Sequence, residues 1–479
     1  MTPVNPVGTV EDLHASASRR TGLTDFGPDD YTDGLAVLLD SYAEEAGLTP
    51  AGAKANRAFL RGILTARLLS AAAWRAHPEY VQVPIDRPVF VTGLPRTGTT
   101  ALHRLLTADP ASQGLEVWLA QVPQPRPPRR TWADNPIFQQ IQDGFAQHHV
   151  EHPEFMGVHY MAADQVEECW QLLQQSMRSI SFETLAHVPG YSAWLRGQDW
   201  TGAYQRHRSN LQMIGLHDGG RRWVLKNPSH LFALDALLAV YPDAAVIQTH
   251  RSPRTAIASA CSLAAHASAG WSPVFTGKEI GRSQLDLWAR GLSLFTAERA
   301  RHDQARFFDV RYDDLVADPV GTVEAIYGHF GLPLTGAAAD AVRSLAATAR
   351  AGGDSAHRYT LDEFGLTGEE VDERFAADPV LPVGSRLPVG SRLSVGSRQF
   401  DGDRRGRRRG FDLVGEEGVD EVGEGVGGER GADQEDGRQR DENAARYQLG
   451  AGGDAFRADP DLSIAHLPAE VQAGHEGQE

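Results

Sequence analysis

A glycine-containing loop between a buried strand and a helix limits the folds open to this chain more than any other segment. Residues 88–92 (PVFVT) form a short, continuous apolar run, which is typical of a strand buried in a parallel sheet. Residues 93–100 (GLPRTGTT) follow as a turn, and apolar side chains then recur at helical spacing up to residue 107. Glycines let such a loop curl until its N–H groups point at one anion, and the helix N-terminus adds partial positive charge. The segment is therefore predicted to be a phosphate-binding P-loop.

The residues within this loop favour anion binding over metal-assisted hydrolysis. A nucleoside triphosphatase loop has the pattern GxxxxGKS or GxxxxGKT, whereas here Thr99 occupies the lysine position and the cation lies at Arg96. The strand predicted at 244–249 also ends without the carboxylate that would hold magnesium. Thr97 and Thr100 offer further hydroxyl donors. We expect a phosphate-like group in this loop and no metal; a tight turn without a ligand is the alternative.

Three further strands are predicted from short apolar runs at 223–225, 244–249 and 306–310, with helical patterns between them. This alternation predicts an α/β fold with a P-loop-type parallel sheet flanked by helices. Right-handed crossovers bring the carboxyl ends of the strands to one edge of the sheet, where ligands bind. Helical patterns also cover residues 31–80 and 137–217.

The segment 137–217 is predicted to form a helical cap insertion over the ligand site. It is rich in tryptophan, tyrosine and methionine. Four of its aromatic side chains either line an apolar pocket or belong to the core, namely Trp170, Tyr191, Trp194 and Tyr204.

Composition divides the chain into an N-terminal helical segment (1–85), a P-loop domain (86–375) and a tail (376–479). The tail is rich in glycine and arginine, lacks tryptophan, and contains three hexads over 381–398 (LPVGSR, LPVGSR, LSVGSR). It has too little apolar mass to offset the entropy of ordering, so we predict a low-complexity, disordered tail. A stack of β-solenoid coils is the alternative. The abrupt start of the tail suggests a shifted reading frame or a non-homologous extension.

Charge and cysteine content exclude several classes of protein. The formal net charge of −17 argues against a nucleic-acid binder, which is usually basic. Two cysteines make neither a disulfide framework nor a zinc site by themselves. The first 20 residues hold no apolar run, and the apolar stretch 58–74 is interrupted by Arg61 and Arg67. We therefore expect a cytoplasmic protein without a transmembrane segment.

A second anion site is predicted after the strand at 244–249. Arg251 lies where the backbone leaves the sheet, and Ser259 follows eight residues later, about two helical turns on. An arginine suits bidentate recognition of phosphate, although it could instead cap a neighbouring helix. Two anion sites on one sheet edge suggest a nucleotide that carries phosphates at two positions.

Two of these segments, 88–106 and 223–263, closely resemble the nucleotide-binding segments of sulfotransferases that use 3′-phosphoadenosine 5′-phosphosulfate (PAPS). The bacterial branch related to tyrosylprotein sulfotransferases is the most similar, and the resemblance extends to 307–332 and 357–375. It implies that Arg96, Thr97, Gly98, Thr99 and Thr100 bind the 5′-phosphosulfate, and that Arg251 and Ser259 bind the 3′-phosphate. Many cytosolic sulfotransferases have lysine at the position of Arg96, and their Arg-Lys-Gly adenine motif is missing here. The segment 357–375 could supply the adenine contacts instead.

Sulfuryl transfer needs fixed cations near the equatorial oxygens and a base for the acceptor hydroxyl. Arg96 and Lys226, the last residue of its strand, are the candidate cations. The tyrosylprotein branch implies that Glu116 is the base. His230 is an alternative by likeness to cytosolic sulfotransferases, and His159 is another from a segment that could close over the acceptor.

The sequence thus predicts a PAPS-dependent sulfotransferase that acts on a hydroxyl of a small-molecule or lipid acceptor, and we expect that acceptor to be apolar. The rival enzyme is a P-loop kinase-like phosphotransferase, and the non-catalytic rival is a nucleotide-binding module. Neither a nucleic-acid partner nor a metal is expected, and the oligomeric state is left open.

Overall fold

A parallel sheet of five strands, in the order β2-β3-β1-β4-β5, forms the centre of the computed structural model. The structure describes residues 5–151, 162–351 and 360–376. The strands are β1 (Val89–Gly93), β2 (Ser112–Gln113), β3 (Arg222–Lys226), β4 (Ala245–His250) and β5 (Phe307–Arg311). The predicted α/β fold with a P-loop-type parallel sheet is confirmed. The sequence pattern missed only β2, because two residues are too few to show a strand period.

The order of the strands places a switch point at β1. The chain leaves β1 toward β2 and β3 on one side, and later returns to pair β4 with the other side of β1. In sheets of this kind a crevice opens at the carboxyl ends of the strands at the switch point. The loops after β1, β3 and β4 therefore meet at one edge.

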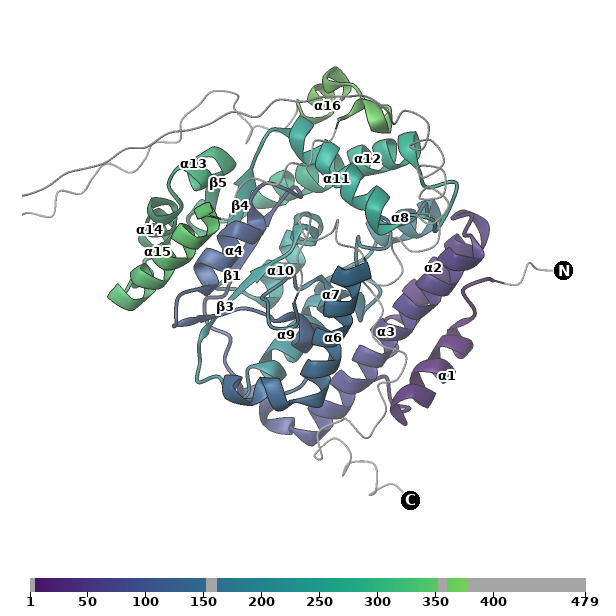
Figure 1. Cartoon of the computed structure of the whole chain (residues 1–479), viewed down its shortest axis with the longest axis horizontal. Helices are drawn as coiled ribbons and strands as arrows, with labels where there is room; N and C mark the ends of the chain where they lie inside the picture. The colour runs from purple at the N-terminus through teal and green to yellow at the C-terminus, as the bar shows by residue number, and fades with distance from the viewer. Residues whose placement is uncertain (1–4, 152–161, 352–359, 377–479) are drawn as a thin grey trace, which may run out of the picture. The chain divides into compact units, whose positions relative to one another are not determined.

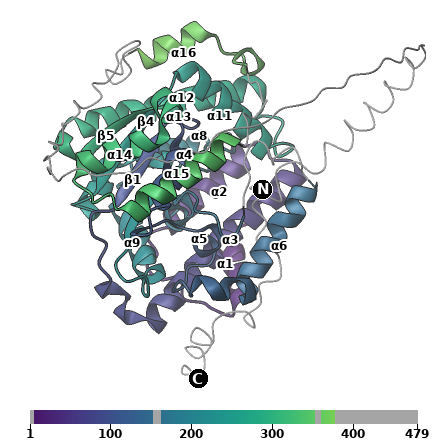
Figure 2. The ribbon, with the colours of Figure 1, turned by 60° about the vertical axis from the view of Figure 1, so that its left-hand side comes forward.

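Side chains of β1 alternate between two cores. Val89 and Val91 pack with apolar residues of α4 (Thr99–Thr107), α14 (Pro319–Phe330) and α15 (Gly336–Ala351). Phe90 points the other way, into a core that it shares with α9 (Thr201–Ile214) and α10 (Leu234–Val240). Figures 1 and 2 show α14 and α15 beside α4. Both faces of the sheet are covered, as the continuous apolar strand predicts.

The N-terminal helices belong to the same apolar core as Phe90. They are α1 (Val10–Thr21), α2 (Thr32–Glu44) and α3 (Pro50–Ala76). Thr49 caps α3 by accepting the N–H of Gly52, and Pro50 fits the first helical position. In Figure 1, α1 and α3 run side by side, in agreement with their packing contacts.

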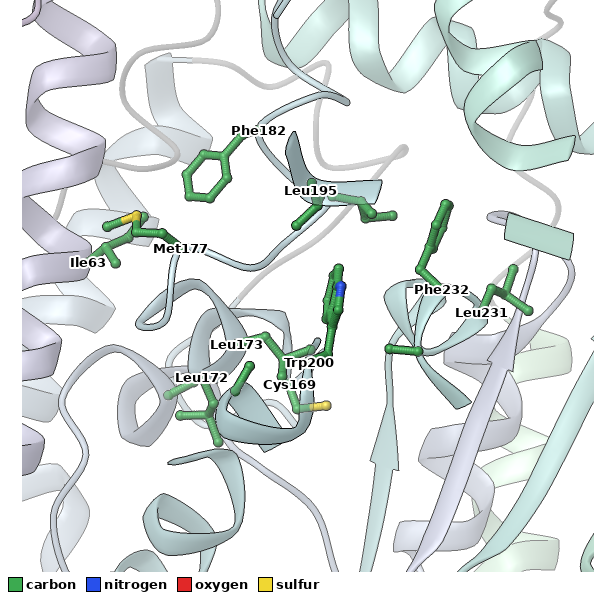
Figure 3. Close-up of a cluster of buried hydrophobic side chains, with 14 of the residues drawn as sticks. Ile63, Cys169, Leu172, Leu173, Met177, Phe182, Leu195, Trp200, Leu231 and Phe232 are labelled. Carbon is green, nitrogen blue, oxygen red and sulfur yellow. The ribbon is translucent and has the colours of Figure 1, made fainter. Parts of the chain in front are cut away.

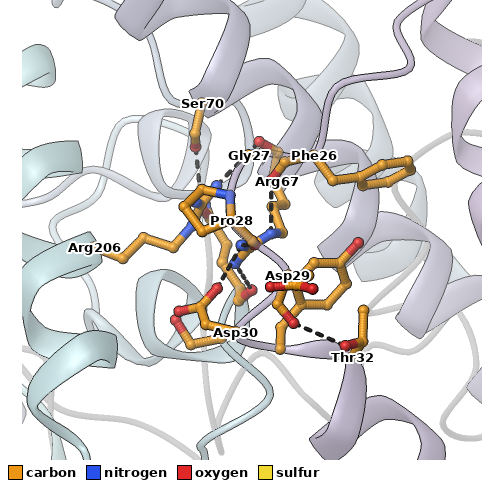
Figure 4. A network of polar contacts seen from close by, with 12 residues as sticks. Phe26, Gly27, Pro28, Asp29, Asp30, Thr32, Arg67, Ser70 and Arg206 are labelled. Carbon is orange, nitrogen blue, oxygen red and sulfur yellow. Dashed lines mark hydrogen bonds and ion pairs between the residues drawn. The ribbon is translucent and has the colours of Figure 1, made fainter.

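A buried arginine ties this region together (Figure 4). The Arg67 guanidinium donates to the main-chain carbonyls of Phe26, Pro28 and Gln175 and to the Asp30 carboxylate, whose Oδ1 lies 2.7 Å away. Arg206 of α9 lies beside it and donates to the Arg67 carbonyl at 3.1 Å. A buried cation is tolerated only when its donors are satisfied. The cluster therefore holds the connection between α1 and α2 against α3 and α9.

The region predicted as a cap is helical. It contains α6 (Pro136–Glu151), α7 (Trp170–Gln174), α8 (Pro189–Arg196) and α9. Figure 3 shows Leu172 and Leu173 of α7 and Phe182 packed in one cluster with Ile63 of α3 and Phe232, which follows β3. This part of the chain is thus joined to the N-terminal helices by apolar contact.

The remaining elements complete the chain. The helices are α5 (Val117–Gln121), α11 (Pro253–Ala267), α12 (Gly277–Arg299), α13 (Tyr312–Ala317) and α16 (Gly368–Phe375). The 3₁₀ turns are η1 (Pro78–Gln82), η2 (Arg129–Asp134), η4 (Pro228–Phe232), η5 (Gln304–Arg306) and η6 (Asp362–Phe364). Of the described helices, none has the length and apolarity needed to cross a membrane. Almost all of the predicted disordered tail, the hexads included, lies outside the described residues, as does His159.

Candidate functional site

The loop after β1 has the conformation of an anion cradle. Gly93 adopts a φ of +146°, and a Cβ there would lie 2.5 Å from the Thr249 hydroxyl. Gly98 adopts a φ of +91°, and a Cβ there would lie 3.1 Å from the side chains of Leu315 and Tyr312. Both positions therefore require glycine, because a side chain would be strained and crowded. The loop leads directly into α4, whose N-terminal N–H groups are available to an anion.

Arg96 is the cation of this loop, and its side chain is partly buried. Its φ of +68° is left-handed, which is strained for a residue with a side chain and is typical of functional sites. Within the described residues its guanidinium makes no ion pair. The Thr97 hydroxyl was expected to bind the ligand. It is instead held inside the loop by the Leu94 carbonyl at 2.7 Å and the Thr249 hydroxyl at 2.5 Å.

Lys226 ends β3 and reaches the loop from the adjacent strand. Its ammonium is fully buried and donates to Glu167 at 2.8 Å, to Glu168 at 2.9 Å and to the Thr100 hydroxyl at 3.1 Å. Burial acts to lower the pKa of Lys226, but the two carboxylates outweigh burial and raise it above its ordinary value. Lys226 therefore carries a charge beside Thr100. The sequence analysis missed both glutamates, because they lie in a segment without a regular pattern.

Arg251 lies against the same loop. Its Nη1 donates to the Arg96 carbonyl at 3.1 Å, and its guanidinium carbon lies 3.9 Å from the centre of the Tyr312 ring. Ser259 is buried on α11, the helix that begins just after Arg251. The structure therefore places Arg251 against the P-loop, and Ser259 on the helix that follows Arg251. Tyr312 was missed by the sequence analysis, although an aromatic residue directly after a predicted strand could have indicated it.

An apolar cavity of about 320 Å³ opens beside the P-loop. Its size lies in the range of small-molecule sites. Helices α3, α7, α11 and α12 supply half of its wall, including Phe59, Ile63, Trp170, Leu263 and Trp288. Glu167 and Glu168 also line the cavity, and both contact Lys226 beside Thr100 of the P-loop helix; Pro95 of the loop is another lining residue.

Of the four cap aromatics named in the sequence analysis, Trp170 lines this cavity. Tyr191 and Tyr204 are fully buried members of the apolar core, and Trp194 packs against that core. Their helical spacing marked the buried faces of α8 and α9. No local pattern distinguishes such a face from a pocket wall.

Glu116, the expected base, is engaged elsewhere. Its Oε2 accepts two hydrogen bonds from the Arg126 guanidinium, at 3.1 and 2.9 Å, and Arg126 also pairs with Asp218. Burial raises the pKa of Glu116, while Arg126 opposes that shift. Glu116 is not among the residues that line the cavity.

His230, the alternative base, lies in the apolar core. Its Nδ1 lies 2.7 Å from the Tyr204 hydroxyl and its Nε2 lies 3.4 Å from the Cys169 sulfur. Burial and the neighbouring His207 hold the pKa of His230 well below its ordinary value. A neutral histidine enclosed in this way does not face the cavity, so its position gives no support to a role as base.

The segment that could supply adenine contacts is described from residue 360 onward. Its helix α16 packs on α11, and Asp372 accepts both guanidinium hydrogen bonds of Arg254. This places α16 on the helix that carries Ser259. In the part of the chain that the structure describes, no group of three or more histidine, cysteine, aspartate or glutamate side chains could hold a metal ion.

Comparison with known proteins gives consistent matches. Residues 88–336 match the model of the sulfotransferase family. The crystal structure of sulfotransferase STF1 from Mycobacterium tuberculosis H37Rv is 58% identical, with a TM-score of 0.73 over 78% of this chain and 99% of that chain. Sulfotransferase STF9 from Mycobacterium avium is 29% identical, with a TM-score of 0.68 over 77% of this chain and 95% of its own. The omega-hydroxy-beta-dihydromenaquinone-9 sulfotransferase Stf3 of Mycobacterium bovis is 26% identical over 63% of this chain and 78% of its own length.

Proposed function

The chain belongs to the sulfotransferase family, and from this premise we propose that it uses PAPS to sulfate a hydroxyl on an elongated, apolar acceptor. It is an enzyme of sulfuryl transfer, as its relatives are. Residues 86–375 would form the catalytic domain, with 137–217 as its cap and 376–479 as a tail, and the N-terminal helical segment 1–85 packs into the apolar core of that domain. The free thiols of Cys169 and Cys261 are compatible with a reducing compartment such as the cytoplasm.

The observation that carries the donor proposal is the contact of Arg251 with the P-loop. PAPS has a charged group at each end of its ribose, and the Arg251 guanidinium lies within hydrogen-bond distance of the Arg96 carbonyl. Neither guanidinium has a carboxylate partner among the described residues, which fits a site for an anionic ligand. Arg96, Gly98, Thr99, Thr100 and Lys226 would hold the phosphosulfate.

The 3′-phosphate would be held by Arg251 and Ser259. The Thr97 hydroxyl is occupied within the loop, so Thr97 would bind through its main-chain N–H. When bound, PAPS supplies an activated sulfuryl group, and the residues of this chain orient that group and stabilise the charge that develops on it.

The acceptor proposal rests on the apolar cavity. Its mostly apolar wall suits a hydrocarbon chain, and it includes Pro95 of the P-loop and two glutamates that contact Lys226. A curated relative is named for a menaquinone derivative with a hydroxyl. We therefore expect a hydroxyl carried on a long hydrocarbon or isoprenoid chain.

A two-part assay of the full chain tests this proposal. Titration calorimetry should show adenosine 3′,5′-bisphosphate binding far more tightly than ATP. Labelled sulfate from PAPS should pass to long-chain alcohols, polyprenols or alkylphenols. Equal affinity for ATP, or transfer of phosphate from ATP, would support a P-loop kinase-like phosphotransferase. Binding of the bisphosphate without sulfate transfer to any acceptor would support a non-catalytic nucleotide-binding module.

A pair of neighbouring arginines gives the matched control. Arg251→Ala should weaken bisphosphate binding by about 10- to 100-fold, since it removes a charged hydrogen-bond donor. Arg254→Ala should leave that affinity unchanged, because Arg254 is paired with Asp372. Equal effects of the two variants would contradict the assignment of Arg251.

A further inference from the structure

One face of helix α3 forms part of the cavity wall. Four of its residues follow the spacing i, i+3, i+4 and i+7, which places them together on one side of a helix, and all four line the cavity. These residues are Phe59, Gly62, Ile63 and Ala66. Leu60 and Leu64, by contrast, are fully buried in the apolar core. A side chain at position 62 would therefore extend from the same face as Phe59 and Ala66, toward the cavity.

Gly62 leaves open space on this face. A glycine inside a helix destabilises that helix relative to alanine, so its presence calls for a reason. Gly52, on the same helix, has a packing reason, because a Cβ there would collide with the Trp271 carbonyl oxygen. At Gly62, no described atom outside its own stretch of helix lies within 4 Å of such a Cβ. Packing among the described residues therefore does not require glycine here, and a side chain would take up cavity space.

The other walls of the cavity have little freedom to move away from a new side chain. The Phe59 ring packs against Phe182, with the two ring centroids 5.9 Å apart. Helix α11 contributes four lining residues with the same helical spacing, and three of them are alanine: Ala260, Leu263, Ala264 and Ala267. An alanine has no rotamers through which it could make room. A bulky residue at position 62 would therefore narrow the cavity.

Helix α3 also lies outside the region that the family model matches. That model matches residues 88–336, which contain the P-loop, Lys226 and Arg251, whereas α3 ends at Ala76. The groups proposed to hold the donor thus come from the matched region, while α3 adds a wall to the acceptor cavity. A substitution on the cavity face of α3 can therefore change the fit of the acceptor without altering the donor groups.

We propose that Gly62 determines acceptor specificity, because the space left by its missing side chain holds part of the acceptor's aliphatic tail. This inference rests on the proposed function. The tail lies against Phe59, Gly62 and the alanines of α11, while the acceptor hydroxyl lies at the P-loop. Moving the methylenes of the tail from water into this apolar space supplies binding energy. Gly62 thus favours acceptors with a long tail over compact ones.

The test compares Gly62→Leu with the wild-type enzyme on two phenols, para-hexylphenol with an aliphatic tail and para-cresol with a single methyl group. Gly62→Leu should lower kcat/KM for para-hexylphenol by about 10- to 100-fold, since about two to three methylenes lose their apolar site. The Kd of para-hexylphenol, from titration calorimetry on the enzyme bound to adenosine 3′,5′-bisphosphate, should rise by a similar factor. The kcat/KM for para-cresol and the Kd of the bisphosphate should stay at their wild-type values. Gly328→Leu, the same change at an exposed glycine of α14 with open space over it, is the matched control and should alter none of these quantities.

An equal loss for both phenols, or no loss for para-hexylphenol, overturns the role of Gly62. If Gly62→Leu does not fold, Gly62→Ala replaces it, because one methyl group fits the open space and alanine favours a helix. This variant should lower kcat/KM for para-hexylphenol relative to para-cresol by about fourfold, and an unchanged ratio also overturns the proposal. A wild-type enzyme that sulfates neither these phenols nor the other acceptors contradicts the proposed function. The calorimetric Kd of para-hexylphenol then still decides whether Gly62 borders a site for an aliphatic tail.

Discussion

At the scale of single residues, the charge balance around Lys226 determines the chemistry of the site. A fully buried ammonium would be costly alone, and two carboxylates and a hydroxyl offset that cost. Because its pKa is raised, Lys226 stays protonated throughout the neutral range. The lysine therefore offers a permanent positive charge beside the P-loop, between that loop and two carboxylates that line an apolar cavity.

Replacing Lys226 should therefore destabilise the fold as well as abolish transfer. Lys226→Met leaves two carboxylates without their counterion, and we expect a loss of about 3 kcal/mol in the free energy of unfolding, measured in urea. Adding Glu167→Gln should restore part of that loss, since one of the unpaired charges is removed. A double variant no more stable than the single one would show that the pairing is not the source of the effect.

At the scale of elements, the P-loop combines strain with function. Arg96 is the loop residue with a side chain that adopts a left-handed conformation, whereas Gly93 and Gly98 adopt positive φ at little cost. The strain places the Arg96 carbonyl where Arg251 can donate to it. The loop thus links the two anion-binding groups through its backbone.

Two variants of Arg96 distinguish the effect of its backbone conformation on stability from the effect of its charge on activity. Arg96→Ala and Arg96→Gly should both lose transfer activity, because both remove the cation. Arg96→Gly should be more stable than Arg96→Ala by about 1 kcal/mol, since a φ of +68° costs glycine little. Thermal unfolding of the two proteins measures the difference. Equal stability would mean that the loop relaxes to another conformation.

At the scale of the whole molecule, one apolar core joins the N-terminal helices, helices α7, α8 and α9, and the sheet. Residues of α1, α2 and α3 share this core with Phe90 of β1, and α3 also forms part of the cavity wall. Val371 and Phe375 on α16 are buried and belong to the same core. The acceptor site is thus a product of elements far apart in the sequence.

Deleting the tail tests its independence from this core. A chain ending at residue 376 should keep the unfolding temperature and the kcat of the full chain, because the removed segment has too few apolar residues to contribute to a core. Differential scanning calorimetry and the transfer assay measure both. A lower value of either would count against a disordered tail and against its origin as an extension.

The sequence by itself determined the P-loop, four of the strands, and the positions of Arg96, Lys226 and Arg251 at strand ends. These features depend on local backbone conformation and on hydrophobic periodicity, which neighbouring residues specify. Only the tertiary structure decided that Glu116 pairs with Arg126, that His230 is enclosed by Tyr204 and Cys169, and that Glu167 and Glu168 meet Lys226. The physical reason is that partners separated by tens of residues are chosen by how the helices pack, and no local pattern records that choice.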